Sequence, residues 1–98
     1  MQLEISKMKK RIEYTKDFIK HFKARISNQT NLEQRVQQRI DLFLEDRFTP
    51  ILQDHRLTGK LKMYRSFSVT GDCRIIYYEK ENNVVFVFVD TGSHNQVY

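Results

Sequence analysis

The stretch DCRIIYYEKENNVVFVFVDTGSH, residues 72–94, decides how the rest of the chain is interpreted. Residues 73–79 follow a period of two, which places Arg74, Ile76 and Tyr78 on one face of a β-strand. Glu81-Asn82-Asn83 has the composition of a turn. Residues 84–89 are apolar on both faces, which is typical of a central strand covered on both sides. The stretch therefore predicts two neighbouring strands of one sheet.

A third strand is predicted immediately before this stretch, over residues 61–69. Thr70-Gly71-Asp72 separates it from the next strand and has the composition of a turn. One face of the strand is formed by Leu61, Met63, Arg65, Phe67 and Val69. Short turns between consecutive strands predict an antiparallel meander.

Two helices are predicted upstream of the strands. Thr15 can cap a helix that begins at Lys16, and residues 27–29 break it. Thr30 and Glu33 have the spacing of a capping box for a second helix, which Pro50 should end because it lacks an amide hydrogen. The stripes facing the core are Phe18, Ile19, Phe22 and Ile26 in the first helix and Leu32, Val36, Ile40, Phe43 and Leu44 in the second.

The N-terminal region completes the predicted architecture. Residues 11–14 alternate as a brief strand would, whereas residues 1–10 are expected to be a short helix or a frayed arm. We predict a single α+β domain over residues 1–98, in which an N-terminal strand and a two-helix hairpin pack on an antiparallel meander sheet.

Composition limits the class of protein. Seven Phe and five Tyr within a hydrophobic content of 40% indicate a folded domain and not a disordered chain. The single Cys73 excludes an internal disulfide and a cysteine-based zinc site. No apolar run approaches the roughly 20 residues of a membrane helix, and the first residues lack the apolar core of a signal peptide. We therefore expect a cytoplasmic protein that does not associate with membranes.

Charge is concentrated at the N-terminal end. The net charge is +5, and the first thirty residues, with eight Lys or Arg against three acidic residues, supply the whole excess. Such a region favours a polyanionic partner, either nucleic acid or an acidic protein. The alternative is a helix face that is merely solvated.

Five polar side chains stand out in and around the predicted strands: His55, Arg65, Arg74, His94 and Tyr98. Histidine can move a proton near neutral pH. Arginine stays charged and can bind two phosphate oxygens. A phenol can stack on a base or exchange a proton. Together they are the parts needed for metal-free cleavage of an RNA phosphodiester.

Each of these residues also has a structural interpretation. His94 follows Thr-Gly-Ser beyond the last strand, where it is either well positioned or an ordinary loop histidine. Arg74 needs a partner within an apolar strand, which Asp72 or Glu79 can supply. Arg65 fits a structural role better than a catalytic one.

The remaining candidates are equally open. His55 follows Asp54, and such a pair can be a cap, an orienting pair or a base. Tyr98 can simply dock on the core. His21 is expected to be an exposed bystander, and Cys73 a small buried hydrophobic residue.

The order of the motifs is more specific than any one of them. Asp-His-x-Leu-x-Gly (54–59), Tyr-Arg (64–65), Asp-x-Arg-Ile-Ile-Tyr (72–77) and Thr-Gly-Ser-His (91–94) follow one another. This series resembles the RelE/ParE superfamily of small bacterial type II toxins, and within it the RelE/StbE and YafQ-like messenger-RNA interferases. Between residues 11 and 46 only the strand–helix–helix pattern and Tyr14-x-x-x-Phe18 agree.

The resemblance implies ribosome-dependent cleavage of messenger RNA without metal or cofactor, contact with ribosomal RNA, and neutralisation by an acidic cognate antitoxin. By position, His94 and His55 match catalytic histidines of the family, and Arg74 matches an arginine that binds phosphate and stabilises the transition state. Asp72 matches an acidic residue at the start of a strand, and Tyr98 matches a C-terminal aromatic residue. We assign RNA binding to Arg65, Lys60, Lys62, Lys16, Lys20 and Lys23.

The chain also departs from the family pattern at three positions. Ser68 stands where YafQ-like members have a histidine, Cys73 where a tryptophan is common, and Asp90 where a basic residue often precedes Thr-Gly. Two alternatives follow: a ParE-like inhibitor of DNA gyrase on the same fold, or a degenerate member that binds its antitoxin without cleaving RNA, for which Asp90 is the indication.

Overall fold

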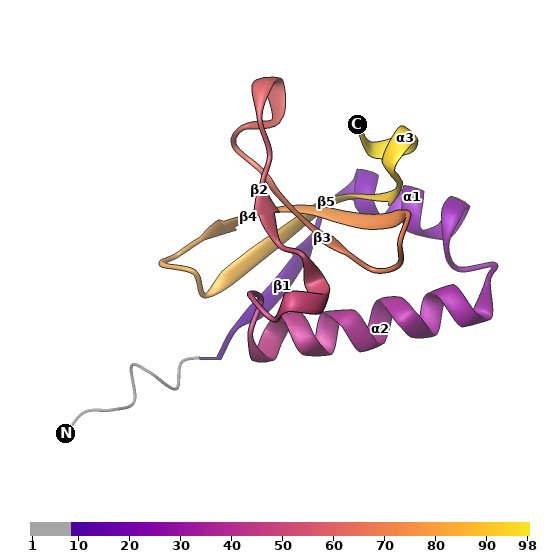
Figure 1. The fold of residues 1–98 in the computed structure, drawn as a ribbon, viewed down its shortest axis with the longest axis horizontal. Coiled ribbons are helices and arrows are strands. Elements are labelled where there is room, and N and C mark those ends of the chain that lie inside the picture. Colours follow the sequence, from indigo (N-terminus) through magenta and orange to yellow (C-terminus); the bar gives the residue numbers. More distant parts are fainter. Residues whose placement is uncertain (1–8) are drawn as a thin grey trace.

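A computed structural model describes residues 9–98 (Figure 1), so the prediction for residues 1–10 falls almost entirely outside the described part. The helices are α1 (Lys16–Arg25), α2 (Thr30–Glu45) and α3 (His94–Val97), with short 3₁₀ turns at Pro50–Leu52 and Gly59–Leu61. The strands are β1 (Arg11–Tyr14), β2 (His55–Arg56), β3 (Arg65–Ser68), β4 (Cys73–Lys80) and β5 (Val85–Ser93). No helix in this part of the chain is long and apolar enough to cross a membrane.

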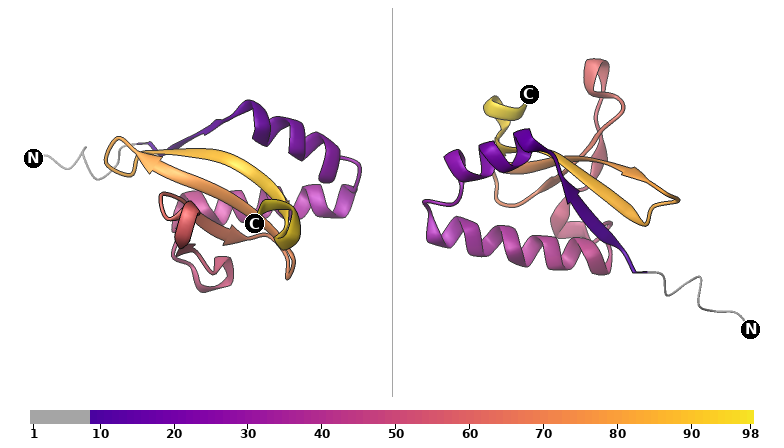
Figure 2. Two further views of the ribbon diagram at one scale, coloured as in Figure 1. Left: turned by 90° about the horizontal axis from the view of Figure 1, so that it is seen from above. Right: turned by 180° about the vertical axis from the view of Figure 1, so that it is seen from behind.

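The strands form one mixed sheet in the order β1-β5-β4-β3-β2. β3, β4 and β5 pair antiparallel, as predicted, and β1 joins the sheet parallel to β5. β1 covers only the first half of β5, from Val85 to Phe88, whereas β4 pairs with β5 as far as Ser93. Among the described residues, the second half of β5 therefore has a strand on one side only, and α1 packs along it (Figure 2).

The main core lies between α2 and one face of the sheet. Phe43 of α2 is fully buried, with its ring centroid 4.7 Å from that of Phe67 and 4.9 Å from those of Tyr77 and Phe86. Val85 and Val87, which alternate with Phe86 along β5, are buried as well. The prediction of a strand covered on both faces is thus confirmed.

The helix boundaries correct several sequence-based predictions. The Thr15 cap is confirmed, since its Oγ1 accepts a hydrogen bond from the Phe18 amide at 3.1 Å. The capping box at Thr30 is wrong, because α2 begins one residue earlier than that box requires, with Gln29 as the N-cap. Ile19, expected to face the core, is 43% exposed.

Pro50 does not end α2. The helix stops at Glu45, where the side chain of Asp46 accepts a hydrogen bond from the Phe48 amide and competes with a further helical turn. Pro50 instead begins the 3₁₀ turn that leads toward β2.

The predicted strand over residues 61–69 is shorter than expected. Only Arg65–Ser68 is a strand, and Met63 is 71% exposed because its segment belongs to a loop. The missed element is β2, which pairs antiparallel with β3. Together they form a hairpin that rises, like α3, from the side of the sheet opposite α2 (Figure 2).

Candidate active site

A hollow of about 430 Å³ lies on the side of the sheet opposite α2. The β2–β3 hairpin, β4 and α3 supply its walls, namely His55, Leu57, Thr58, Leu61, Arg74, His94 and Tyr98. Four of the five residues matched to the family's catalytic positions are therefore brought together, although they come from three separate segments. The C-terminal imidazole of His94 and the guanidinium-bearing Arg74 of β4 thus line the same hollow.

His94 and Tyr98 are held by the short C-terminal helix. The Ser93 side chain accepts a hydrogen bond from the Gln96 amide, and the Gln96 side chain accepts one from the Ser93 amide, which forms a capping box. The His94 amide donates to Asp72 Oδ1 at 3.3 Å. The His94 and Tyr98 rings lie one helical turn apart, with centroids at 4.6 Å in an edge-to-face arrangement. Tyr98 therefore contacts His94 and is exposed, not docked on the core.

Arg74 reaches the hollow from β4, and no counterion for it is found within residues 9–98. Neither Asp72 nor Glu79 pairs with it, contrary to the structural interpretation, and Glu79 instead binds Arg47. Among the described residues, the buried Nε of Arg74 has no hydrogen-bond partner. A buried donor without a partner is costly, and the uncompensated positive charge of Arg74 favours an anion in the hollow that it lines.

His55 is oriented by a backbone carbonyl. Its Nδ1 lies 2.8 Å from the Gln53 carbonyl oxygen. Because a carbonyl only accepts, Nδ1 carries the proton, and in the neutral ring Nε2 keeps a free lone pair. His55 is therefore prepared to accept a proton at Nε2.

Asp54 does not orient the neighbouring histidine. Its buried carboxylate accepts hydrogen bonds from Arg65 Nε at 2.7 Å and from the Tyr77 hydroxyl. Burial, reinforced by this carboxylate, raises the pKa of Tyr77 well above its ordinary value. Arg65 also lies over the Phe48 ring and does not line the hollow, so its contacts are those of a structural residue.

The other assigned residues surround the hollow. Lys60 and Lys62 are exposed in the β2–β3 hairpin, next to the wall residue Leu61. Asp72 lines a neighbouring hollow of about 890 Å³ and reaches the candidate site only through the His94 amide. The side chains of Lys16, Lys20 and Lys23 are exposed on α1.

Two departures from the family pattern are buried. Ser68 donates a hydrogen bond to the Thr70 carbonyl at 2.6 Å, so its hydroxyl is engaged outside the hollow. Cys73 is a buried free thiol, as predicted, and burial raises its pKa. Within residues 9–98, no group of three or more His, Cys, Asp or Glu side chains could hold a metal ion.

The third departure, Asp90, faces α1 and not the hollow. Its Oδ1 lies 2.6 Å from His21 Nδ1 and 3.5 Å from Arg25. The expectation that His21 is an exposed bystander is therefore wrong, and the Asp90 charge is compensated. No local pattern predicts a contact between residues 69 positions apart.

Known proteins share both the sequence pattern and the fold of this chain. The model of a family described as a bacterial toxin of type II toxin–antitoxin systems, YafQ, matches residues 10–98. The crystal structure of YafQ from Escherichia coli BL21(DE3) superposes with a TM-score of 0.75 at 22% identity, covering 92% of this chain and 99% of that one.

Two further structures bear on the comparison. The toxin–antitoxin complex DinJ–YafQ of E. coli gives a TM-score of 0.69 at 24% identity over 92% of this chain and 98% of that one. A metal-bound toxin from Helicobacter pylori gives a TM-score of 0.67 at 29% identity, covering 89% of this chain and 97% of that one. No curated protein sequence matches this chain.

Proposed function

Because the chain belongs to the YafQ family of bacterial type II toxins, we propose that it is a ribosome-dependent endoribonuclease that cleaves messenger RNA and so inhibits translation. One observation carries this proposal. A guanidinium without a counterion among the described residues, Arg74, shares a solvent-open hollow with two imidazoles and a phenol.

The proposed reaction begins with attack of a ribose 2′-hydroxyl on the adjacent phosphate. His55 Nε2 is suited to take the 2′-hydroxyl proton, because the Gln53 carbonyl fixes the proton of this ring on Nδ1. In its charged form, His94 is suited to protonate the leaving 5′-oxygen. The P–O5′ bond then breaks, which leaves a 2′,3′-cyclic phosphate and a 5′-hydroxyl.

Arg74 and Tyr98 support this proton transfer. Arg74 would donate to the non-bridging oxygens, where negative charge accumulates in the transition state. Tyr98 packs against the His94 ring in an edge-to-face arrangement and presents an exposed phenol on which a base can stack. These side chains need no metal, so cleavage in the presence of EDTA should equal that without it, provided that the ribosomes keep their Mg²⁺.

The basic surface would place the enzyme on RNA. Lys60 and Lys62 are exposed on either side of the wall residue Leu61, and the α1 lysines add a second cationic surface. Contacts of this kind are electrostatic and weaken steeply with salt. We propose messenger RNA on the ribosome and ribosomal RNA as the partners of these surfaces.

We also propose a cognate antitoxin as protein partner. The E. coli relative is present in a complex with its antitoxin DinJ, and the cationic surface described here favours an acidic partner. An antitoxin that covers the hollow would shield Arg74 from RNA.

The experiment is inducible expression of His94→Ala beside wild type and the neighbouring exposed control Asn95→Ala. Wild type and Asn95→Ala should arrest growth and produce new transcript 5′ ends, whereas His94→Ala should do neither while still binding the antitoxin. Full toxicity of His94→Ala would remove the proton role assigned to this residue. Growth arrest with intact transcripts and damaged DNA would favour gyrase inhibition instead.

A further inference from the structure

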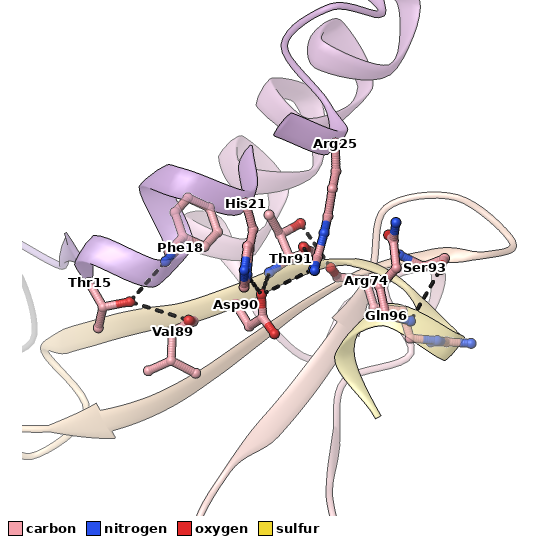
Figure 3. A network of polar contacts seen from close by, with 10 residues as sticks. All are labelled: Thr15, Phe18, His21, Arg25, Arg74, Val89, Asp90, Thr91, Ser93 and Gln96. Carbon is pink, nitrogen blue, oxygen red and sulfur yellow. Dashed lines mark hydrogen bonds and ion pairs between the residues drawn. The ribbon is translucent and has the colours of Figure 1, made fainter. Parts of the chain in front are cut away.

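In the part of the chain that the structure describes, the second half of β5 has no strand partner on the side facing α1. β1 ends its pairing at Phe88, yet the candidate site depends on the residues that follow, since β5 leads directly into His94. Figure 3 shows that side chains of α1 and of its cap occupy this open edge. Thr15 Oγ1 donates to the Val89 carbonyl at 3.2 Å, and Arg25 donates to the Thr91 carbonyl at 3.0 Å.

Arg25 is in turn fixed by charge. Asp90 Oδ1 lies 3.5 Å from Arg25, accepts from the Thr91 amide at 2.8 Å, and lies 2.6 Å from His21 Nδ1. A carboxylate only accepts, so His21 Nδ1 carries the proton in this contact. His21, Arg25 and Asp90, which we call the α1 clamp, are all partly buried, with side-chain exposures of 23–27%.

The clamp contacts the segment that connects the two proposed catalytic groups. Thr91, which accepts from Arg25 through its carbonyl, donates through its hydroxyl to the Arg74 carbonyl at 3.0 Å. One residue further, a Cβ on Gly92 would lie 2.9 Å from Arg25 and 2.6 Å from Gln96. The guanidinium therefore packs directly against the strand end, two residues before His94.

We infer that Arg25, held by Asp90 and His21, is a positioning residue that fixes Arg74 and His94 relative to each other. The inference rests on the proposed function for its kinetic consequence, but its geometric content is independent of that function. None of the three clamp residues lines the hollow, so they act through Thr91 and Gly92 and not on the substrate. A displacement of about 1 Å in a catalytic group can cost roughly 100-fold in rate.

The test compares Arg25→Met with Arg35→Met. Both variants lose one positive charge. Arg35 is the control because it is an exposed arginine of α2 for which no ion pair is found in the described part of the chain. In single-turnover cleavage on programmed ribosomes, Arg25→Met should lower the rate constant roughly 10- to 100-fold. The concentration giving half-maximal rate should stay within about twofold for both variants, and Arg25→Lys should recover part of the loss.

A second measurement separates this inference from the proposed function. In the isolated protein, the ring protons of His94 sense the edge-to-face Tyr98 ring, so their NMR shifts report its position. Arg25→Met should move these shifts and Arg35→Met should not. Asp90→Asn, which keeps an acceptor for the Thr91 amide, provides a milder variant if Arg25→Met fails to fold, and it should show smaller changes in the same direction.

The outcomes are distinct. The inference is supported if the clamp variants alone cleave more slowly, with an unchanged concentration at half-maximal rate, and alone show shifted His94 signals. Wild-type rates in Arg25→Met, or His94 signals identical to those of wild type, overturn it. If the wild-type protein cleaves no RNA, the proposed function fails, and the NMR comparison alone decides whether the clamp positions His94.

Discussion

Arg74→Met should have opposite effects on stability and on activity. The guanidinium is held in β4 with a buried Nε for which the described residues offer no partner, so the folded protein carries the cost of an unsatisfied donor. Methionine keeps most of the length of the side chain without the donor. Among the described residues, Arg74 supplies the only guanidinium that lines the hollow, so the same change removes the group that would bind the phosphate in the proposed reaction.

The magnitudes follow from these two roles. Leaving a buried donor unsatisfied costs about 1–3 kcal/mol. Because Arg74→Met removes this donor, we expect the free energy of unfolding to rise by about 1 kcal/mol. For a domain of this size, that corresponds to a rise in Tm of roughly 4–8 °C. Loss of one preorganised donor to transition-state charge lowers catalysis by about 100- to 1,000-fold.

Thermal unfolding followed by circular dichroism and single-turnover cleavage on ribosomes measure the two effects. Arg35→Met, which removes an exposed arginine, is the control and should change stability by less than about 0.5 kcal/mol. A destabilised Arg74→Met would mean that the guanidinium has a structural partner in the native protein. Cleavage within a few fold of wild type would remove its proposed catalytic role.

Three further predictions address the core, the Asp54 network and the basic surface. Phe43→Ala should lower the free energy of unfolding by about 3–5 kcal/mol in urea titrations, because its ring fills the centre of the aromatic core. The raised pKa of Tyr77 means that the folded state holds the phenolic proton more tightly than the unfolded state does. The resulting contribution to folding stability is complete below the unfolded pKa of about 10 and is lost as the pH rises above it, by up to about 1.4 kcal/mol per pH unit. Tyr77→Phe should flatten this decline when the free energy of unfolding is measured against pH. Gln at both Lys60 and Lys62 should reduce the slope of log affinity against log salt for single-stranded RNA by about 1.4, if each lysine contacts one phosphate, and an unchanged slope would place the RNA elsewhere.

The sequence predicted those parts of the fold that depend on local periodicity. The Thr15 cap, the apolar stripe of α2 and the fully apolar β5 each depend on residues close together in the chain, and all three are found. The order of the motifs also placed His55, Arg74 and His94 in one candidate site, and the three residues line the same hollow. Composition and spacing alone would not have grouped them.

The failures have a common physical cause, which is competition from tertiary contacts. Residues 61–64 continue the period-two pattern of β3, but they belong to a loop that contributes Leu61 to the hollow and leaves Met63 in solvent. The sequence neighbours Asp54 and His55 suggest a local pair, but Asp54 binds Arg65 and Tyr77 across the sheet. His21 and Asp90 meet only because α1 lies along the half of β5 with which β1 does not pair.

The most direct test of the central claim is cleavage of a messenger RNA that carries a single 2′-deoxynucleotide immediately 5′ of the scissile phosphate, on purified ribosomes. The account predicts that the all-ribose message yields a 2′,3′-cyclic phosphate and a 5′-hydroxyl, and that the deoxy message stays intact at that position while still being bound. Cleavage of the deoxy message at the same bond, or no cleavage of either message, would contradict it.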